Sequence, residues 1–190
     1  MKLLSFLAVL LLSAGTLSAQ WSMNPSINTV VCDTAGLQKD VRLTSDGDGG
    51  VFMVWRDYRK GTNSSDIYAQ RLDSLGFPMW TANGVGVCTL SADQSTPAII
   101  SDDRGGVLIA WSDWRSGIER DLYAQRLDAN GNIMWQANGA PITTKNAREH
   151  SEKIVRDDHG GLPADGLVSW RFWQLPHPSD GRRARHGVPL

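Results

Sequence analysis

The sequence predicts an all-β protein built from tandem four-stranded antiparallel units, and three observations support this fold class. Residues 49–61 (GGVFMVWRDYRKG) return as residues 105–117 (GGVLIAWSDWRSG), and residues 66–84 (DIYAQRLDSLGFPMWTANG) return as residues 121–139 (DLYAQRLDANGNIMWQANG). Within each copy, turns rich in Gly and Asp separate short apolar and β-branched runs. No segment shows sustained helical periodicity. A repeat of this kind indicates that the chain stacks one structural unit several times.

The amino terminus indicates export. Lys2 precedes an apolar run over residues 3–12, and small residues end at Ala19. These features predict a cleavable signal peptide over residues 1–19, because the run is shorter than the roughly 20 apolar residues that cross a bilayer. No later stretch is apolar enough to serve as a membrane span. We therefore expect a mature chain that begins near Gln20 and is secreted or held at the cell surface, outside the cytoplasm.

Each unit is expected to contain four short strands. The second strand is apolar at successive positions, which is typical of a strand buried on both faces. The third alternates more and is rich in β-branched and aromatic residues. The expected strands lie around residues 41–43, 51–55, 67–72 and 80–88, and again around residues 98–100, 107–111, 122–127 and 135–143.

The repeat also predicts the domain boundaries. Residues 20–161 form the repeat region, with full units over residues 33–88 and 89–143 and a partial unit over residues 144–161. Residues 21–32 resemble a stray fourth strand ahead of the first full unit. Cys32 and Cys88 occupy equivalent positions of successive repeats, which lie too far apart for a disulfide, so we expect two free, buried cysteines.

Four antiparallel strands in a unit of this size match a β-propeller blade. The third hairpins, LDSLGFPMW and LDANGNIMW, resemble the Asp-box of sialidase-type propellers, although the spacing is relaxed and Arg71 and Arg126 stand where that motif has Ser. The string W-x-D-x-R followed by DIYAQRLD also resembles blade repeats in long secreted bacterial proteins. The resemblance implies a propeller architecture, and it implies no enzymatic activity.

Two full units are fewer than the four to eight blades of a closed ring. Three explanations remain open: the chain is a fragment, several copies assemble into a ring, or the units form an open stack. The pattern is lost after Gly161, apart from a candidate second strand over residues 167–170. Residues 162–190 are expected to form an irregular or disordered basic tail, either one that binds a polyanion or the product of a truncated or frame-shifted gene, which we favour.

One polar trio recurs in both full units and is the candidate ligand site. Trp beside a carboxylate and a guanidinium could hold a sugar, because the ring stacks on the sugar face and the charged groups bond its hydroxyls. The same trio could instead be a packed ring with an ion pair that fixes a loop, and its repetition favours this structural interpretation. The six residues are Trp55, Asp57, Arg59, Trp111, Asp113 and Arg115.

Other chemistry has weaker support. No pair of carboxylates interrupts the repeat as a glycosidase site would, so no catalytic residue is predicted. The turns rich in Asp offer too few carboxylates for a strong calcium site, so no cofactor or metal site is expected. The turn carboxylates are Asp46, Asp48, Asp102, Asp103, Asp157 and Asp158.

The sequence therefore favours an exported, non-catalytic module for binding or scaffolding. Its expected partner is an extracellular glycan or protein, or further copies of the chain. Because the formal net charge is −1, nucleic acid is not expected as a partner. The alternative is a fragment of a sialidase-like glycoside hydrolase.

Overall fold

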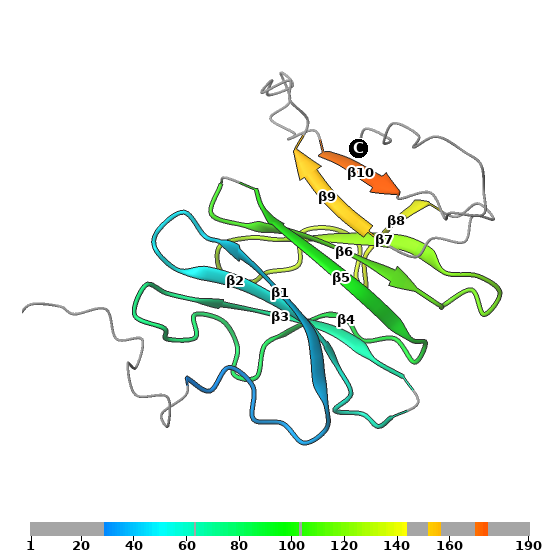
Figure 1. Ribbon diagram of the computed structural model, residues 1–190, viewed down its shortest axis with the longest axis horizontal. Helices are drawn as coiled ribbons and strands as arrows, with labels where there is room; N and C mark the ends of the chain where they lie inside the picture. The colour runs from blue at the N-terminus through cyan, green and yellow to red at the C-terminus, as the bar shows by residue number, and fades with distance from the viewer. Residues whose placement is uncertain (1–28, 63, 103, 144–151, 157–169, 175–190) are drawn as a thin grey trace, which may run out of the picture.

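The computed structural model describes residues 29–62, 64–102, 104–143, 152–156 and 170–174, the last two ranges as backbone only. Within these residues the chain forms strands and no helix, and the strands build two four-stranded sheets and one two-stranded sheet (Figure 1). The first sheet contains β1 (Gln38–Ser45), β2 (Val51–Asp57), β3 (Asp66–Leu72) and β4 (Val85–Cys88). The second contains β5 (Gln94–Ser101), β6 (Val107–Asp113), β7 (Asp121–Leu127) and β8 (Ala140–Thr143). The third pairs β9 (Glu152–Arg156) with β10 (Trp170–Gln174).

The two large sheets have the same topology. Each is an antiparallel meander in which the strands follow in sequence order. They also share an irregularity, because the register shifts between Lys39 and Arg42 in β1 and between Ser95 and Ala98 in β5. The predicted fold class, tandem four-stranded antiparallel blades of propeller type in an incomplete set, is confirmed.

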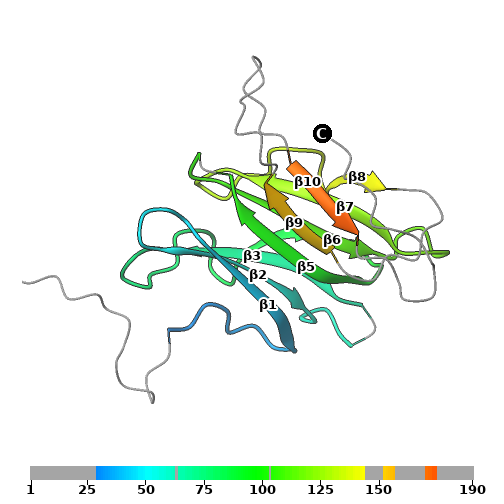
Figure 2. The ribbon, with the colours of Figure 1, turned by 45° about the horizontal axis from the view of Figure 1, so that its top comes forward.

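The main hydrophobic core lies between the two large sheets, which pack face to face (Figure 2). Each sheet contributes the side chains of one face, because neighbouring residues of a strand point to opposite faces. The first sheet contributes Phe52, Val54, Ile67, Ala69, Trp80, Val87 and Cys88, and the second contributes Val107, Ile109, Trp111 and Leu127. Every residue of β6 is buried, as expected for a strand covered on both faces.

The side chain of Trp80 connects the outer edges of the two sheets. Its indole Nε1–H donates to the carbonyl oxygen of Ala129 at 3.0 Å, in the turn between β7 and β8. A Cβ atom on Gly131 would lie 2.8 Å from the Trp80 ring, so glycine allows the indole to lie flat on this turn. The tryptophan of the third hairpin therefore contacts the next blade as well as Phe52 of its own blade, whose ring centroid lies 5.6 Å away.

The third unit is a strand pair beside the second sheet. β9 lies next to β5, and β10 pairs with β9 (Figure 1). Residues 170–174 lie within the tail that we expected to be irregular, so that expectation was wrong for them; the aromatic sequence WRFWQ favours a strand. The strand also begins where the candidate strand over residues 167–170 was expected to end. The rest of residues 162–190, like the predicted signal peptide, lies outside the described residues.

Two further expectations concern the cysteines and the membrane. Both cysteines are free, as predicted, but only Cys88 is a buried strand residue; Cys32 is half-buried and precedes β1. Its side chain lies at the edge of the first sheet, where it has less cover. The described part of the chain has no helix that could span a membrane.

The repeated Ala-Asn-Gly segment supports a stability prediction. Gly139 has φ +91°, and a Cβ there would lie 2.3 Å from Cη2 of the buried Trp111. Gly139→Ala is expected to lower the free energy of unfolding by about 3–5 kcal/mol, because backbone strain and overpacking add. Gly117→Ala is the control, since Gly117 also has a positive φ but nothing within 4 Å of the added Cβ. It should cost about 1 kcal/mol. Equal losses in urea titrations would contradict the packing argument.

Candidate functional site

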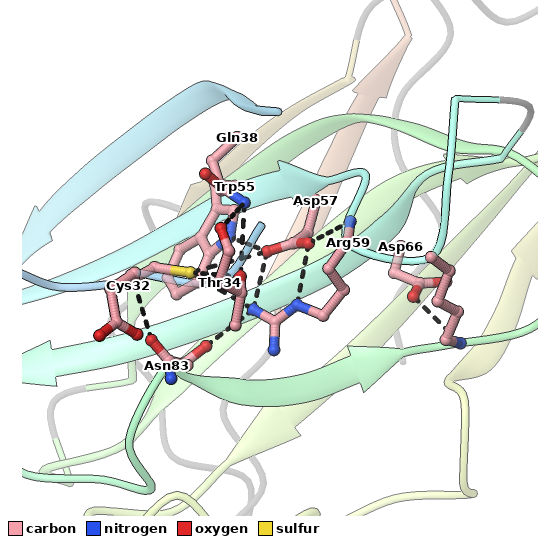
Figure 3. A network of polar contacts seen from close by, with 10 residues as sticks. Cys32, Thr34, Gln38, Trp55, Asp57, Arg59, Asp66 and Asn83 are labelled. Carbon is pink, nitrogen blue, oxygen red and sulfur yellow. Dashed lines mark hydrogen bonds and ion pairs between the residues drawn. The ribbon is translucent and has the colours of Figure 1, made fainter. Parts of the chain in front are cut away.

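The predicted trio of the first sheet forms a closed hydrogen-bonded cluster at the end of β2 (Figure 3). The Trp55 indole Nε1–H donates to Asp57 Oδ2 at 2.8 Å. Arg59 donates to both oxygens of the same carboxylate, from Nε at 2.9 Å and from Nη2 at 2.7 Å. Its backbone N–H also donates to Asp57 Oδ1 at 2.8 Å. The cluster therefore holds the chain in a fixed turn just after the strand.

The second sheet repeats the cluster except for one bond, because the Nε–H of Arg115 has no hydrogen-bond partner among the described residues. Trp111 Nε1–H donates to Asp113 Oδ2 at 2.9 Å, and Arg115 Nη2 donates to the same oxygen at 2.6 Å. In both sheets the arginine also bonds the backbone carbonyl of the Ala-Asn-Gly segment, at 2.8 Å on Asn83 and at 2.8 Å on Asn138. The six predicted site residues thus form two separate trios, one in each sheet.

The trio tryptophans are enclosed. The residue exposures of Trp55 and Trp111 are 3% and 0%. A tyrosine lies beside each ring, with ring centroids 6.3 Å apart for Trp55 and Tyr68. The arginine then covers that tyrosine, with the Arg59 Cζ atom 3.6 Å from the Tyr68 centroid. Because a sugar needs an open ring face, this geometry favours the structural interpretation of the trio, and we name each trio a brace.

A cysteine that precedes the first strand of each sheet completes its brace. Arg115 Nη2 lies 3.4 Å from Cys88 Sγ, and Arg59 Nη2 lies 3.5 Å from Cys32 Sγ. Burial raises the pKa of Cys88 to about 12, which keeps its thiol protonated. Cys32 stands in the same place relative to the first sheet. Residues 32–34 therefore occupy the position that the end of a preceding blade would occupy.

Two carboxylates at the end of the first sheet, Asp57 and Asp66, have pKa values that shift in opposite directions. Burial disfavours ionisation of Asp57, but hydrogen bonds from Arg59 and Trp55 outweigh it and hold the pKa of Asp57 below its usual value. Asp66 is the cross-strand partner of Asp57. Burial raises the pKa of Asp66, and Lys60, 3.0 Å from Oδ2, offsets only part of the rise. Asp66 Oδ1 has no hydrogen-bond partner among the described residues.

The structure brings forward two aromatic residues that the sequence interpretation missed. Tyr58 and Trp114 occupy the position between Asp and Arg in the two braces, in the loops that follow β2 and β6. The brace turns this position outward, and Trp114 is 39% exposed. The available signal was an aromatic residue at the same loop position in both repeats. This signal is weak in the sequence, because the residue itself differs between the repeats while the Asp and Arg on either side are identical.

A row of charged side chains connects these two aromatic residues. Arg56 Cζ lies 5.2 Å from the Tyr58 centroid, and Arg120 Cζ lies 5.8 Å from the Trp114 centroid. Asp93, in the connection between the two sheets, joins the two arginines, at 3.1 Å to Arg56 and 3.3 Å to Arg120. We name these five residues the loop-end row, because all lie where strands end at one edge of the sheets.

Neighbouring groups favour the ionised form of Asp93, the carboxylate of the loop-end row. Burial opposes ionisation of Asp93, but a hydrogen bond from Ser65 and the charges of Arg56 and Arg120 hold its pKa below the usual value. The Ser65 hydroxyl donates to Asp93 Oδ1 at 2.7 Å. Lys39 adds a further cation, 4.8 Å from the Tyr58 centroid. The row therefore presents aromatic and cationic groups together at a half-exposed edge.

The carboxylates of the Gly-Gly turns serve the turns themselves. Asp46 Oδ1 accepts backbone N–H groups of Asp48 and Gly50, at 2.9 and 2.8 Å, and its Oδ2 accepts from Arg71. Asp102 makes the equivalent bonds with Gly106 and Arg126. In the described part of the chain, no group of three or more His, Cys, Asp or Glu side chains is placed to hold a metal ion.

Comparison with known proteins adds little to this description. No protein-family model matches the chain, and no curated protein matches it. Among solved structures, the chain is similar to an endo-arabinase from Bacteroides thetaiotaomicron, with a TM-score of 0.47 and 19% identity over 87% of this chain and 60% of that one. The chain thus spans less than two thirds of that protein. Values this low carry no argument about activity, and the fold assignment rests on strand pairing.

The braces support a stability prediction. Asp57→Asn and Asp113→Asn should each lower the free energy of unfolding by roughly 3 kcal/mol, because a partly buried arginine loses its charged partner. Asp48→Asn is the control, since the exposed Asp48 lies 3.5 Å from Arg71 at the surface, and it should cost less than about 0.5 kcal/mol. Guanidinium titrations followed by tryptophan fluorescence measure these losses. Wild-type stability in the two brace variants would exclude a structural role.

The raised pKa of Asp66 supports a prediction of pH dependence. The folded state binds this proton more tightly than the unfolded state, so the ionised carboxylate destabilises the fold at neutral pH. Asp66→Asn should therefore be more stable than the wild type at pH 7. The difference should shrink as the pH falls through the raised pKa of Asp66 towards the unfolded-state value of about 4.

Urea midpoints of both proteins between pH 4 and pH 7 test this prediction. Asp121→Asn is the matched control, because Asp121 holds the same register position in the second sheet but is only half-buried. Asp66→Asn also removes the ion pair with Lys60, but Lys60 is exposed, so this loss should change the free energy of unfolding little. A gain for Asp66→Asn that grows as the pH falls would have the wrong sign and would contradict the assignment.

Proposed function

We propose that the chain is an exported, non-catalytic module that binds an extracellular carbohydrate at the loop-end row. The observation that carries this proposal is the pairing of the exposed Trp114 ring with the Arg56–Asp93–Arg120 ion pairs at one edge of two neighbouring sheets. Apolar ring faces with a few convergent polar groups are the usual construction of a ligand site. The two aromatic residues of this site, Tyr58 and Trp114, each lie between the Asp and the Arg of a predicted trio.

The rigidity of the loops supports this location. Each brace fixes the residues on either side of the aromatic position, so Trp114 lies between two residues that hydrogen bond to one another. A ring held in this way loses little conformational entropy when a ligand stacks on it. The predicted trios then contribute to binding indirectly, by positioning the loop.

The charge of the row favours glycans that carry hydroxyl and carboxylate groups. Arg56 and Arg120 share Asp93, Arg56 also pairs with Asp40 at 3.3 Å, and Lys39 lies beside Tyr58. Three cations therefore face two carboxylates. Arginine matches carboxylate geometry well because its donors form a planar fork. A uronic acid residue would therefore bind more tightly than its neutral counterpart.

The repetition of the braces supports a non-catalytic role. Catalytic carboxylates need different environments to act as acid and base, whereas Asp57 and Asp113 have matching tryptophan and arginine partners. The alternative, a fragment of a glycoside hydrolase, requires unlike acidic groups that face an open ligand site. Asp57 and Asp66 have pKa values shifted in opposite directions, but each residue is only 1% exposed.

A glycan array probed with the purified mature chain tests the proposal. We expect saturable binding to acidic glycans, and we expect Trp114→Ala to weaken it at least tenfold, as removal of a central aromatic contact does. Ile118→Ala is the matched control, because Ile118 lies in the same loop, is 81% exposed and offers no ring. It should bind like the wild type.

Two outcomes would overturn the proposal. Absence of saturable binding to any glycan would reject the carbohydrate ligand, and equal binding by Trp114→Ala would reject the loop-end row as its site. Release of a chromophore from reporter glycosides by the purified chain would reject the non-catalytic role and favour the hydrolase fragment.

A further inference from the structure

Equivalent faces of the two large sheets differ in how much of their apolar surface is covered. We name the positions in β1 and β2 that correspond to the buried core positions of β5 and β6 the acceptor face: Val41, Leu43, Val51 and Met53. The register fixes the correspondence, since Leu43 pairs with Met53 as Ile99 pairs with Ile109. Leu43 is 59% exposed, whereas its equivalent Ile99 is half-buried. Val51 and Met53 are half-buried, whereas their equivalents Val107 and Ile109 are 0% exposed. The first sheet therefore has an uncovered apolar face.

The covered copy of this face shows what fits it. In the second sheet, the equivalent residues pack against the far side of the first sheet, mainly Phe52, Val54 and Ile67. The natural occupant of the acceptor face is thus the far side of another sheet of the same repeat. Clusters of exposed apolar side chains on a soluble protein commonly mark such interfaces.

The uncovered area is about two strands wide. On the same face, Trp55 at the end of β2 and Leu72 in β3 are buried. Cys32 and the residues that follow it already lie against this outer part, through the brace. The exposed part is therefore confined to β1 and the beginning of β2. A full four-stranded sheet packed on this face would overlap with the residues that already cover its outer part.

A two-stranded sheet lies at the opposite end of the same chain. β9 and β10 hold the positions of the first two strands of a unit, and β9 lies against β5 as β5 lies against β1 (Figures 1 and 2). No further sheet is described beyond this pair. Within the described residues, the first sheet thus carries the partly exposed acceptor face, and the far end carries two strands of the repeat.

We propose that the β9–β10 pair of one copy packs on the acceptor face of a second copy, head to tail. The contact continues the packing that joins the two sheets within one chain. Because its two halves are different surfaces, repeated contacts form a closed ring or an open filament rather than a two-fold dimer. This inference is independent of carbohydrate binding.

Mass in solution is the first test. Light scattering on the eluting mature chain, over a range from about 1 to 100 μM, should show a mass that rises to multiples of the chain mass. Leu43→Asp should remain a monomer throughout, because it places a carboxylate in the apolar contact. Leu43 is exposed, so the variant should fold, and circular dichroism checks this. Phe77→Asp, a change at an exposed apolar residue outside this face, should assemble like the wild type.

A capture experiment tests the head-to-tail geometry. Tagged Leu43→Asp retains an intact β9–β10 pair, so it should capture untagged wild-type chain, which has an intact acceptor face. It should not capture untagged Leu43→Asp. An interface between two acceptor faces predicts no capture in either case and would overturn the geometry. A monomeric wild type across the concentration range, or unchanged assembly of Leu43→Asp, would overturn the proposal as a whole.

Discussion

Each four-stranded sheet of this protein is apolar on both faces, and this constraint governs the rest of the structure. A sheet with one apolar face can rest on a single partner, but β6, buried at every position, needs cover on both sides. Burial of apolar area contributes roughly 25 cal/mol per Å², so a sheet without a neighbour loses a large share of its stability. The second sheet has the first sheet on one side and β9 on the other. The first sheet has only part of that cover.

The repeated polar residues make such stacking feasible. A strand end that is buried between sheets carries polar groups that must find partners. The braces supply them at one edge, and buried glutamines supply them further along. Gln70 accepts the backbone N–H of Trp80 at 2.9 Å and donates to Thr81 at 2.9 Å, and Gln125 does the same in the second sheet. The strongest repetition in the sequence thus records the requirements of blade geometry, and it does not by itself indicate a ligand site.

This distinction sets the limit of what the sequence could predict. Periodicity and turn chemistry located the strands of both full units, because strand burial and hairpin geometry are local properties of the chain. The role of the Trp-Asp-Arg trio was not decidable from its pattern, since a brace and a sugar site use the same side chains, and only the enclosed ring of Trp55 separates them. The exposure of Leu43 was equally hidden, because it depends on the absence of a neighbouring sheet. The repeat did not place the start of β10, because 13 residues separate the bounds of β9 and β10 whereas five separate those of β1 and β2.

The loop-end row sets the number of ligand sites on one chain, and the acceptor face allows several such chains to assemble. Asp93 lies in the covalent connection between the two sheets and joins an arginine from each, so a complete row requires two sheets linked in one chain. The equivalent residue ahead of the first sheet is Leu37, whose carbonyl oxygen accepts from Tyr58 as that of Asp93 accepts from Trp114. Leu37 carries no charge, so a contact between copies would create no further row. Each copy would then contribute one site, and assembly would multiply identical sites at fixed spacing. Because linked sites raise the effective concentration of ligand at one another, a weak site on one chain would become a strong one on the assembly.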